Sequence, residues 1–138
     1  MSTDNGKGGP LAGLKILELA GIGPAPLCCS LMSDLGADVL RIDRNADAGL
    51  GIGRDRRTDL TRRGRKSVSV DLKHSKGLET ILKLVGEADV LVDPFRPGVT
   101  EKLGLGPSDC FARNKKVIYA RMTGWGQTGP SPILRASR

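Results

Sequence analysis

A cluster of basic residues between Arg54 and Lys66 is the first feature of this sequence that could do chemistry. Its thirteen residues hold seven Arg and Lys against Asp55 and Asp59, which gives 7 − 2 = +5 of the net charge of +7 carried by the 138-residue chain. Such a concentration of positive charge favours an anionic partner, either nucleic acid or a phosphorylated small molecule. A solvated basic loop would have the same composition, so three interpretations are open at this point.

Nucleic acid is the least favoured of the three. Proteins that bind single strands stack the bases on aromatic side chains, and residues 54–66 contain no Phe, Tyr or Trp. The sequence also has no RNP, zinc-finger or helix-turn-helix signature. We therefore expect no nucleic-acid partner.

The glycines after the first expected strand match a dinucleotide-binding turn only in part. Gly21 and Gly23 form a G-x-G, and Asp43 follows about twenty residues later, where a ribose-binding acid would stand. However, Pro26 takes the place of the third glycine and Pro24 also intervenes. Because proline removes N–H groups that would bind a pyrophosphate, we expect a tight strand-to-helix turn and neither nicotinamide nor flavin.

Metal sites, common nucleophile motifs and membrane segments are not indicated. His74 is the one histidine, and no cluster of metal ligands surrounds it. No G-x-S-x-G and no GxxxxGK[ST] motif is present. Three cysteines, two of them adjacent, favour reduced thiols inside a cell over disulfides. The start of the chain has no apolar stretch, and no apolar run approaches the ~18–20 residues that span a bilayer.

Short strands alternate with helices along the chain. Short apolar segments predict strands over 14–20, 38–43, 89–93 and 117–122, and an alternating segment predicts one over 67–72. Helices are expected over 26–35 and 75–87, with shorter ones at 98–103 and 107–113. Residues 45–65 and the glycine-rich segment 123–130 are expected to be loops. This alternation predicts an α/β fold with a parallel, doubly wound sheet.

Two of the expected helices carry an apolar period. In the second, Leu78, Ile81, Leu82 and Val85 stand at i, i+3, i+4 and i+7, which is typical of a helix face. In the first, leucines recur every four positions at 27, 31 and 35. The spacing therefore predicts both helices.

Five segments taken together resemble one enzyme family. They are PLAGLKILELAGIGPAP (10–26), DLGADVLRIDR (34–44), RRGRKSVSVDLK (62–73), ADVLVDPFRPGVTEKLGLGP (88–107) and VIYARMTGWGQTGP (117–130). In this order and spacing they resemble the α-methylacyl-CoA racemases of the family III CoA-transferase superfamily. The resemblance implies a Rossmann-like large domain, present here in part. Residues 1–9 would be a flexible leader, 10–130 the N-terminal part of the coenzyme-A-binding domain, and 131–138 a divergent tail.

The resemblance assigns seven residues to coenzyme A. Arg44 and Lys102 match residues near the phosphates. Arg63 and Lys73 fall in segments that border the adenosine 3′-phosphate and adenine. Arg96, Arg121 and Gly124 lie along the wall leading to the thioester. Guanidinium groups suit such a ligand because coenzyme A is a polyanion and arginine can bind phosphate in a bidentate way.

The chemistry that the resemblance implies is removal and return of the proton next to a thioester carbonyl. Such a reaction requires hydrogen-bond donors to the enolate oxygen and two bases flanking the α-carbon. In the racemases these bases are a His in a G-H-D-x-N-Y-type segment after the GQTGP loop and an Asp in a later D-x-x-G-G-type segment. Here SPILRASR follows Pro130, so we expect no catalytic residue in this chain and no racemase activity from it alone.

Two alternatives stay open. One is a CoA-transferase of the same superfamily, which uses an Asp nucleophile; the other is a non-catalytic module that binds coenzyme A or a partner chain. The resemblance further implies an acyl-CoA substrate and a homodimer, in the cytoplasm if the source is bacterial and in a peroxisome or mitochondrion if it is eukaryotic.

Overall fold

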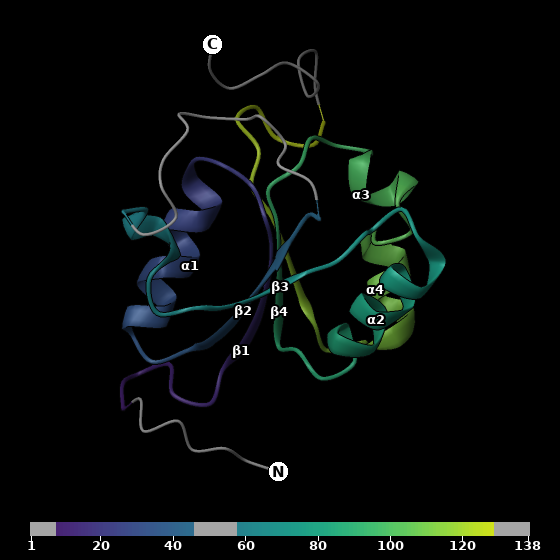
Figure 1. Cartoon of the computed structure of the whole chain (residues 1–138). Helices are drawn as coiled ribbons and strands as arrows, with labels where there is room; N and C mark the ends of the chain where they lie inside the picture. Colours follow the sequence, from purple (N-terminus) through teal and green to yellow (C-terminus); the bar gives the residue numbers. More distant parts are fainter. Residues whose placement is uncertain (1–7, 46–57, 129–138) are drawn as a thin grey trace.

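One parallel β-sheet forms the centre of the computed structural model, which describes residues 8–45 and 58–128 (Figure 1). The strands lie in the order β3-β2-β1-β4-β5, and every neighbouring pair is parallel. In chain order they are β1 (Lys15–Leu19), β2 (Asp38–Asp43), β3 (Lys66–Ser69), β4 (Val90–Asp93) and β5 (Ile118–Arg121). The expected fold class, a parallel α/β sheet, is confirmed.

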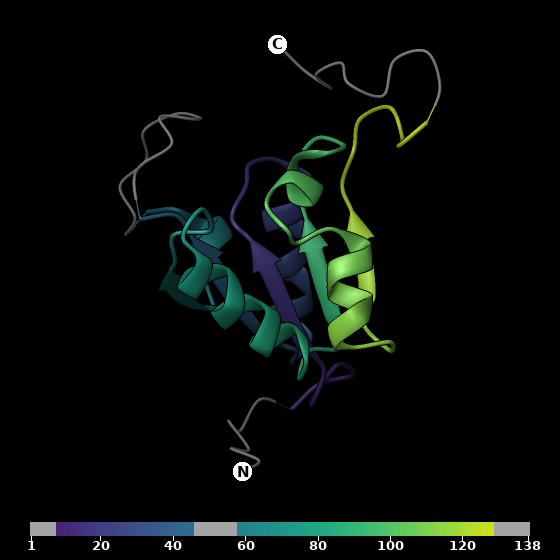
Figure 2. The same ribbon diagram turned by 90° about the vertical axis from the view of Figure 1, so that its right-hand side faces the viewer.

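Helices cover the two faces of the sheet in separate groups (Figures 1 and 2). On one face lie α1 (Pro24–Asp34) and the 3-10 helix η1 (Leu60–Arg62); on the other lie α2 (Ser75–Val85), α3 (Val99–Lys102) and α4 (Pro107–Arg113). A separate cluster of buried apolar residues lies under each group. From β1 the chain builds outward first through β2 and β3 and then, on the other side, through β4 and β5. The strand order therefore reverses between β1 and β4.

The inner strands β1, β2 and β4 are largely apolar and buried because both faces of the sheet are covered there. Successive side chains of a strand point to opposite faces. In β1, Ile16 accordingly packs in the α1 cluster, whereas Leu17 and Leu19 pack in the cluster under α2 and α4. The outer strand β3 is exposed at every position.

The buried face of α1 is made of small side chains. An apolar helix face normally packs on the core, yet the three leucines that predicted this helix, Leu27, Leu31 and Leu35, are 52%, 52% and 47% exposed. The sheet is instead contacted by the opposite side of the helix. That side consists of Ala25, Pro26, Cys29, Ser30 and Ser33. The leucine spacing located the helix correctly but marks its outer face.

Helix α2 begins at Ser75 as expected and ends two residues early, at Val85. Ile81 and Val85 of its predicted apolar face are fully buried. His74 caps the helix, because its Nδ1 accepts a hydrogen bond from the backbone N–H of Lys76 at 3.2 Å. The lone histidine thus has a structural role that the sequence did not reveal.

Strand β3 is shorter than predicted. It ends at Ser69 instead of residue 72, because the carboxylate of Asp71 accepts from the backbone N–H of Lys73 at 2.9 Å and turns the chain toward α2. The 3-10 helix η1 lies within residues 45–65, which were predicted to be a loop. The remaining elements agree with the predicted ranges to within a residue or two.

Several predictions lie outside the described residues. These are the leader over residues 1–7, the basic residues Arg54, Arg56 and Arg57, and the tail over 131–138. Within the described ranges, no helix is long and apolar enough to cross a membrane, and no group of three or more His, Cys, Asp or Glu could hold a metal ion.

Candidate functional site

The carboxyl ends of the parallel strands share one edge of the sheet (Figure 2). In open α/β sheets, ligands bind outside this edge at the point where the strand order reverses. Four residues assigned by the resemblance lie here: Arg44 follows β2, Arg96 follows β4, and Arg121 and Gly124 end and follow β5. The structure therefore brings these four to the same edge.

The turns after β1 and β4 approach each other closely. A Cβ atom on Gly21 would lie 2.5 Å from Cβ of Pro94. This distance is too short for two carbon atoms, so the position requires glycine. Gly23, with φ of 80°, then turns the chain into α1, where Pro24 takes the first position. The expected tight strand-to-helix turn is present, and Pro94 fills the space beside its first glycine.

Arg44 and Arg96 are the exposed cations of this edge. The guanidinium of Arg44 lies over the ring of Phe95, with Cζ 5.2 Å from the ring centroid, which is within cation–π distance. This contact joins the end of β2 to the turn after β4, on either side of β1. Neither arginine pairs with a carboxylate of residues 8–45 or 58–128. Both are thus available to an anion.

Arg121, by contrast, is held by the protein. Its Nη1 donates to Oε1 of Gln127 at 2.6 Å, its Nη2 pairs with Glu101, and its Cζ lies 5.3 Å from the centroid of the Tyr119 ring. The hydrogen bond from Arg121 lowers the pKa of Glu101. With these contacts, and with 19% of its side chain exposed, Arg121 has little left to offer a ligand. Gly124 is exposed in the loop that follows.

A buried carboxylate supports this part of the edge. Asp93 accepts hydrogen bonds from the Thr100 hydroxyl at 2.9 Å, the Tyr119 hydroxyl at 3.2 Å and the backbone N–H of Phe95 at 2.9 Å. Burial raises the pKa of Asp93, while these donors oppose the rise. Asp93 thereby ties together β4, α3, β5 and the turn that holds Phe95. Its only signal in the sequence is an acid at the end of an apolar strand.

Lys73 and Lys102 line one shallow hollow of about 380 Å³ beside the start of α2. Leu72, Leu78 and Leu103 contribute apolar surface to it. Neither lysine pairs with a carboxylate of the described residues. The structure therefore brings together two further cations that the resemblance assigned to coenzyme A.

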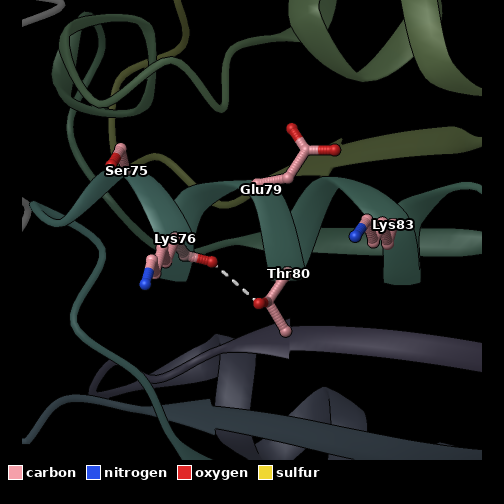
Figure 3. A pocket seen from close by; sticks show the side chains of 5 residues that line it. All are labelled: Ser75, Lys76, Glu79, Thr80 and Lys83. Atoms are coloured by element: carbon pink, nitrogen blue, oxygen red, sulfur yellow. Dashed lines mark hydrogen bonds between the residues drawn. The ribbon is translucent and has the colours of Figure 1, made fainter.

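A second hollow, of about 490 Å³, lies along the outer face of α2 (Figure 3). It is lined by one helix, from Ser75 to Lys83, and the Thr80 hydroxyl in it donates to the carbonyl of Lys76 at 2.8 Å. Glu79, also in its lining, is bonded to Arg113 at 2.8 Å. Nothing in this hollow converges on a ligand.

Arg63 lies away from the other assigned residues. Its Nη2 donates to Asp34 at the end of α1 at 2.5 Å. The chain then enters β3 with Lys66 beside Leu40, near the start of β2. Arg63 is thus close to the amino edge of the sheet, opposite the edge that Arg44 occupies. Its assignment to the adenosine stays a prediction.

The rest of the basic segment, as far as the structure describes it, binds carboxylates of the protein itself. Arg62 pairs with Asp59 and Asp43, Arg65 with Glu18, and Lys66 with Asp38. The described cations therefore fasten residues 59–66 to β1 and β2. Each cation of the segment within residues 58–66 is thus paired with a carboxylate of the fold.

The centre of these pairs is Glu18, which is fully buried in β1. It accepts from Nη1 of Arg41 at 2.7 Å and pairs with Arg65, whose side chain is 1% exposed. Burial raises the pKa of Glu18, and Arg65 and Arg41 oppose this. In the described part of the chain, Nε and Nη2 of Arg65 have no hydrogen-bond partner. A single charge inside the apolar run of residues 14–20 was the only sequence signal for this cluster.

The fold and the site define a doubly wound α/β protein with exposed cations and a closely packed pair of turns at its strand-order reversal. The family model described as CoA-transferase family III matches residues 11–135. The chain belongs to this family.

Three relatives illustrate the family. The protein named alpha-methylacyl-CoA racemase in Mus musculus is 41% identical over 119 residues, which cover 86% of this chain and 29% of the mouse chain. The succinyl-CoA–L-malate CoA-transferase beta subunit of Chloroflexus aurantiacus is 37% identical over 129 residues, or 88% of this chain and 32% of its own. A crystal structure of Rv3272 from Mycobacterium tuberculosis matches with a TM-score of 0.82 and 37% identity, covering 94% of this chain and 37% of that one.

The present chain thus spans about a third of the length of these relatives. A racemase and a transferase are both among them, so the likeness defines the family and not the reaction.

Proposed function

We propose that this chain provides the coenzyme-A-binding part of an enzyme that epimerises 2-methylacyl-CoA thioesters by removing and returning the α-proton. The observation that carries the proposal is the pair of exposed arginines at the strand-order reversal: Arg44, which lies over the Phe95 ring, and Arg96, which follows Phe95 in the turn after β4. The hollow that Lys73 and Lys102 line adds two more cations, neither of which pairs with a carboxylate of residues 8–45 or 58–128.

Coenzyme A fits this distribution of charge because its phosphates are spread along the molecule. An exposed guanidinium can bind a phosphate with two parallel hydrogen bonds, whereas an arginine already bonded to a carboxylate has fewer donors to offer. Arg44, Arg96, Lys73 and Lys102 are therefore the groups of this chain that we expect to hold the ligand. The role of Gly124 would be to let the ligand pass close to the backbone.

Calorimetry with coenzyme A tests the binding role. We expect Arg44→Gln and Arg96→Gln each to weaken binding about tenfold, the effect of losing one charge-assisted contact. Lys115→Ala is the matched control, because Lys115 is an exposed cation just before β5, at the opposite edge of the sheet. An equal loss of affinity in all three variants would mean that only the net charge matters. It would contradict the assignment of Arg44 and Arg96 to coenzyme A.

A comparison of coenzyme A with its 3′-dephospho form addresses the adenosine end. The wild type should bind the 3′-dephospho form more weakly than coenzyme A. This difference in affinity should be smaller in Lys73→Ala. If the two ligands bind the wild type equally well, the assignments of Arg63 and Lys73 to the 3′-phosphate are wrong.

The reaction is tested by deuterium exchange at C2 of a 2-methylacyl-CoA. Because the proton-transfer His and Asp of the racemases have no match in these 138 residues, we expect the chain alone to bind without exchange. Exchange by the purified chain would contradict this. The alternative, a CoA-transferase, is favoured by the likeness to the Chloroflexus aurantiacus subunit. It predicts that any longer protein containing this chain transfers coenzyme A to a free acid, with no α-proton exchange.

A further inference from the structure

The loop over residues 123–128 is fastened to the rest of the protein by Arg121. We propose that Arg121 is a positioning residue, which holds this loop against α3 and acts on the ligand through the loop without touching it. The proposal rests on the proposed function for the identity of the ligand, while the fastening of the loop can be tested without any ligand.

The two terminal nitrogens of Arg121 serve two different elements. Nη1 donates to the side chain of Gln127 in the loop at 2.6 Å, and Nη2 pairs with Glu101 in α3. The guanidinium also lies over the ring of Tyr119. A planar fork with several donors can make all of these contacts at once, whereas a lysine ammonium cannot reproduce them.

The loop contains a closed turn, and Gln127 links this turn to Arg121. The backbone N–H of Gly126 donates to the Thr123 hydroxyl at 3.0 Å, and Gly126 has φ of 83°, so the turn closes on itself. Within the described residues, Nε2 of Gln127 is buried without a hydrogen-bond partner. The bond from Arg121 is thus the polar contact through which the Gln127 side chain is held. Gly124, the residue assigned to the thioester wall, lies in the same loop.

Trp125 makes the position of the loop measurable. It is the only tryptophan of the chain and is 59% exposed, so iodide quenching of its fluorescence reports how closely the loop is held. We expect stronger quenching in ligand-free Arg121→Lys and Gln127→Ala, and no further increase in the double variant. Arg113→Lys is the control, because it alters an exposed Arg–Glu pair between α4 and α2 and should leave quenching unchanged.

Affinity for coenzyme A supplies the second measurement. Both Arg121→Lys and Gln127→Ala should bind about tenfold more weakly, since both loosen the same loop. A direct contact between Arg121 and the ligand predicts another pattern: Gln127→Ala would bind normally, and affinity would fall in Arg121→Lys without a change in quenching. That pattern overturns the proposal, as does unchanged quenching in both variants.

The two proposals fail separately. If the wild-type chain does not bind coenzyme A, the proposed function is contradicted, and the quenching of Trp125 still decides whether Arg121 holds the loop. Gln127→Ala keeps the test valid if Arg121→Lys does not fold, because Gln127 lies in a surface loop outside both core clusters.

Discussion

At the scale of single residues, the buried charge of Glu18 matters most for stability. Its carboxylate is fully buried between Arg41 and Arg65, and removal of one partner of a buried pair leaves an uncompensated charge in a medium of low dielectric constant. We predict that Glu18→Gln lowers the free energy of unfolding by about 3–5 kcal/mol. Urea denaturation of the wild type and the variant measures the difference.

Glu79→Gln is the matched control for this prediction. Glu79 also pairs with an arginine, Arg113, but both side chains are 45% exposed, and exposed pairs contribute only about 0–1 kcal/mol. Because Glu18 and Arg65 are coupled, the double variant Glu18→Gln, Arg65→Met should cost less than the sum of the single changes. If Glu18→Gln and Glu79→Gln lower the free energy of unfolding equally, burial does not strengthen the Glu–Arg interaction.

The sequence could not have predicted this cluster in detail. Glu18 and Arg65 are 47 positions apart, and their contact depends on how residues 59–66 cross α1 before β3. The sequence did reveal the basic segment, and the natural inference from its charge was an external anion. Local composition does not distinguish a cation that binds a ligand from a cation that pairs with a carboxylate far away in the sequence.

At the scale of elements, most of the fold was predictable. Apolar runs marked the inner strands, because strands covered on both faces are apolar throughout, whereas the alternation of residues 67–72 marked β3, which is exposed at every position. The apolar face of α2 was predicted correctly as well. For α1 the leucine spacing predicted the helix but did not identify its buried side, where the small residues Ala25, Cys29 and Ser33 pack on the sheet.

The start of α2 offers a test in which two local effects oppose each other. Gly77 lies in the first turn of the helix, and replacement of glycine by alanine in a helix normally stabilises it by about 1 kcal/mol. Here a Cβ atom would lie 2.1 Å from the carbonyl oxygen of Asp71, so the turn over residues 71–74 would have to move. Overpacking of this kind costs about 1–3 kcal/mol, and we predict that Gly77→Ala is destabilising overall.

Lys83→Ala, an exposed substitution in the same helix, serves as the control in the same urea experiment and should change stability little. A Gly77→Ala variant more stable than the wild type would show that the contact with Asp71 yields easily and that helix propensity dominates at this position.

At the scale of the whole molecule, the outer face of α1 and its end carry three of the nine large hydrophobic residues that are exposed in the described structure. Leu27 and Leu31 lie four residues apart on this helix, and Leu35 continues the line just after it; each is about half exposed. Contiguous apolar surface of this kind promotes association. Because the chain spans about a third of the length of its relatives, the same face could be covered by other parts of a longer protein, and the homodimer implied by the resemblance stays a proposal.

We predict that the chain by itself associates in a concentration-dependent way through this leucine face. The double variant Leu27→Lys, Leu31→Lys should shift the chain toward monomer in sedimentation velocity with little change in melting temperature, because neither leucine belongs to the core clusters. Two added lysines also increase repulsion between molecules. The control is therefore Ser108→Lys, Ala112→Lys, which adds the same charge at exposed positions of α4. If both double variants reduce association equally, the added net charge is the cause, and the prediction for the leucine face is wrong. If only the α1 variant reduces association, the apolar surface drives it.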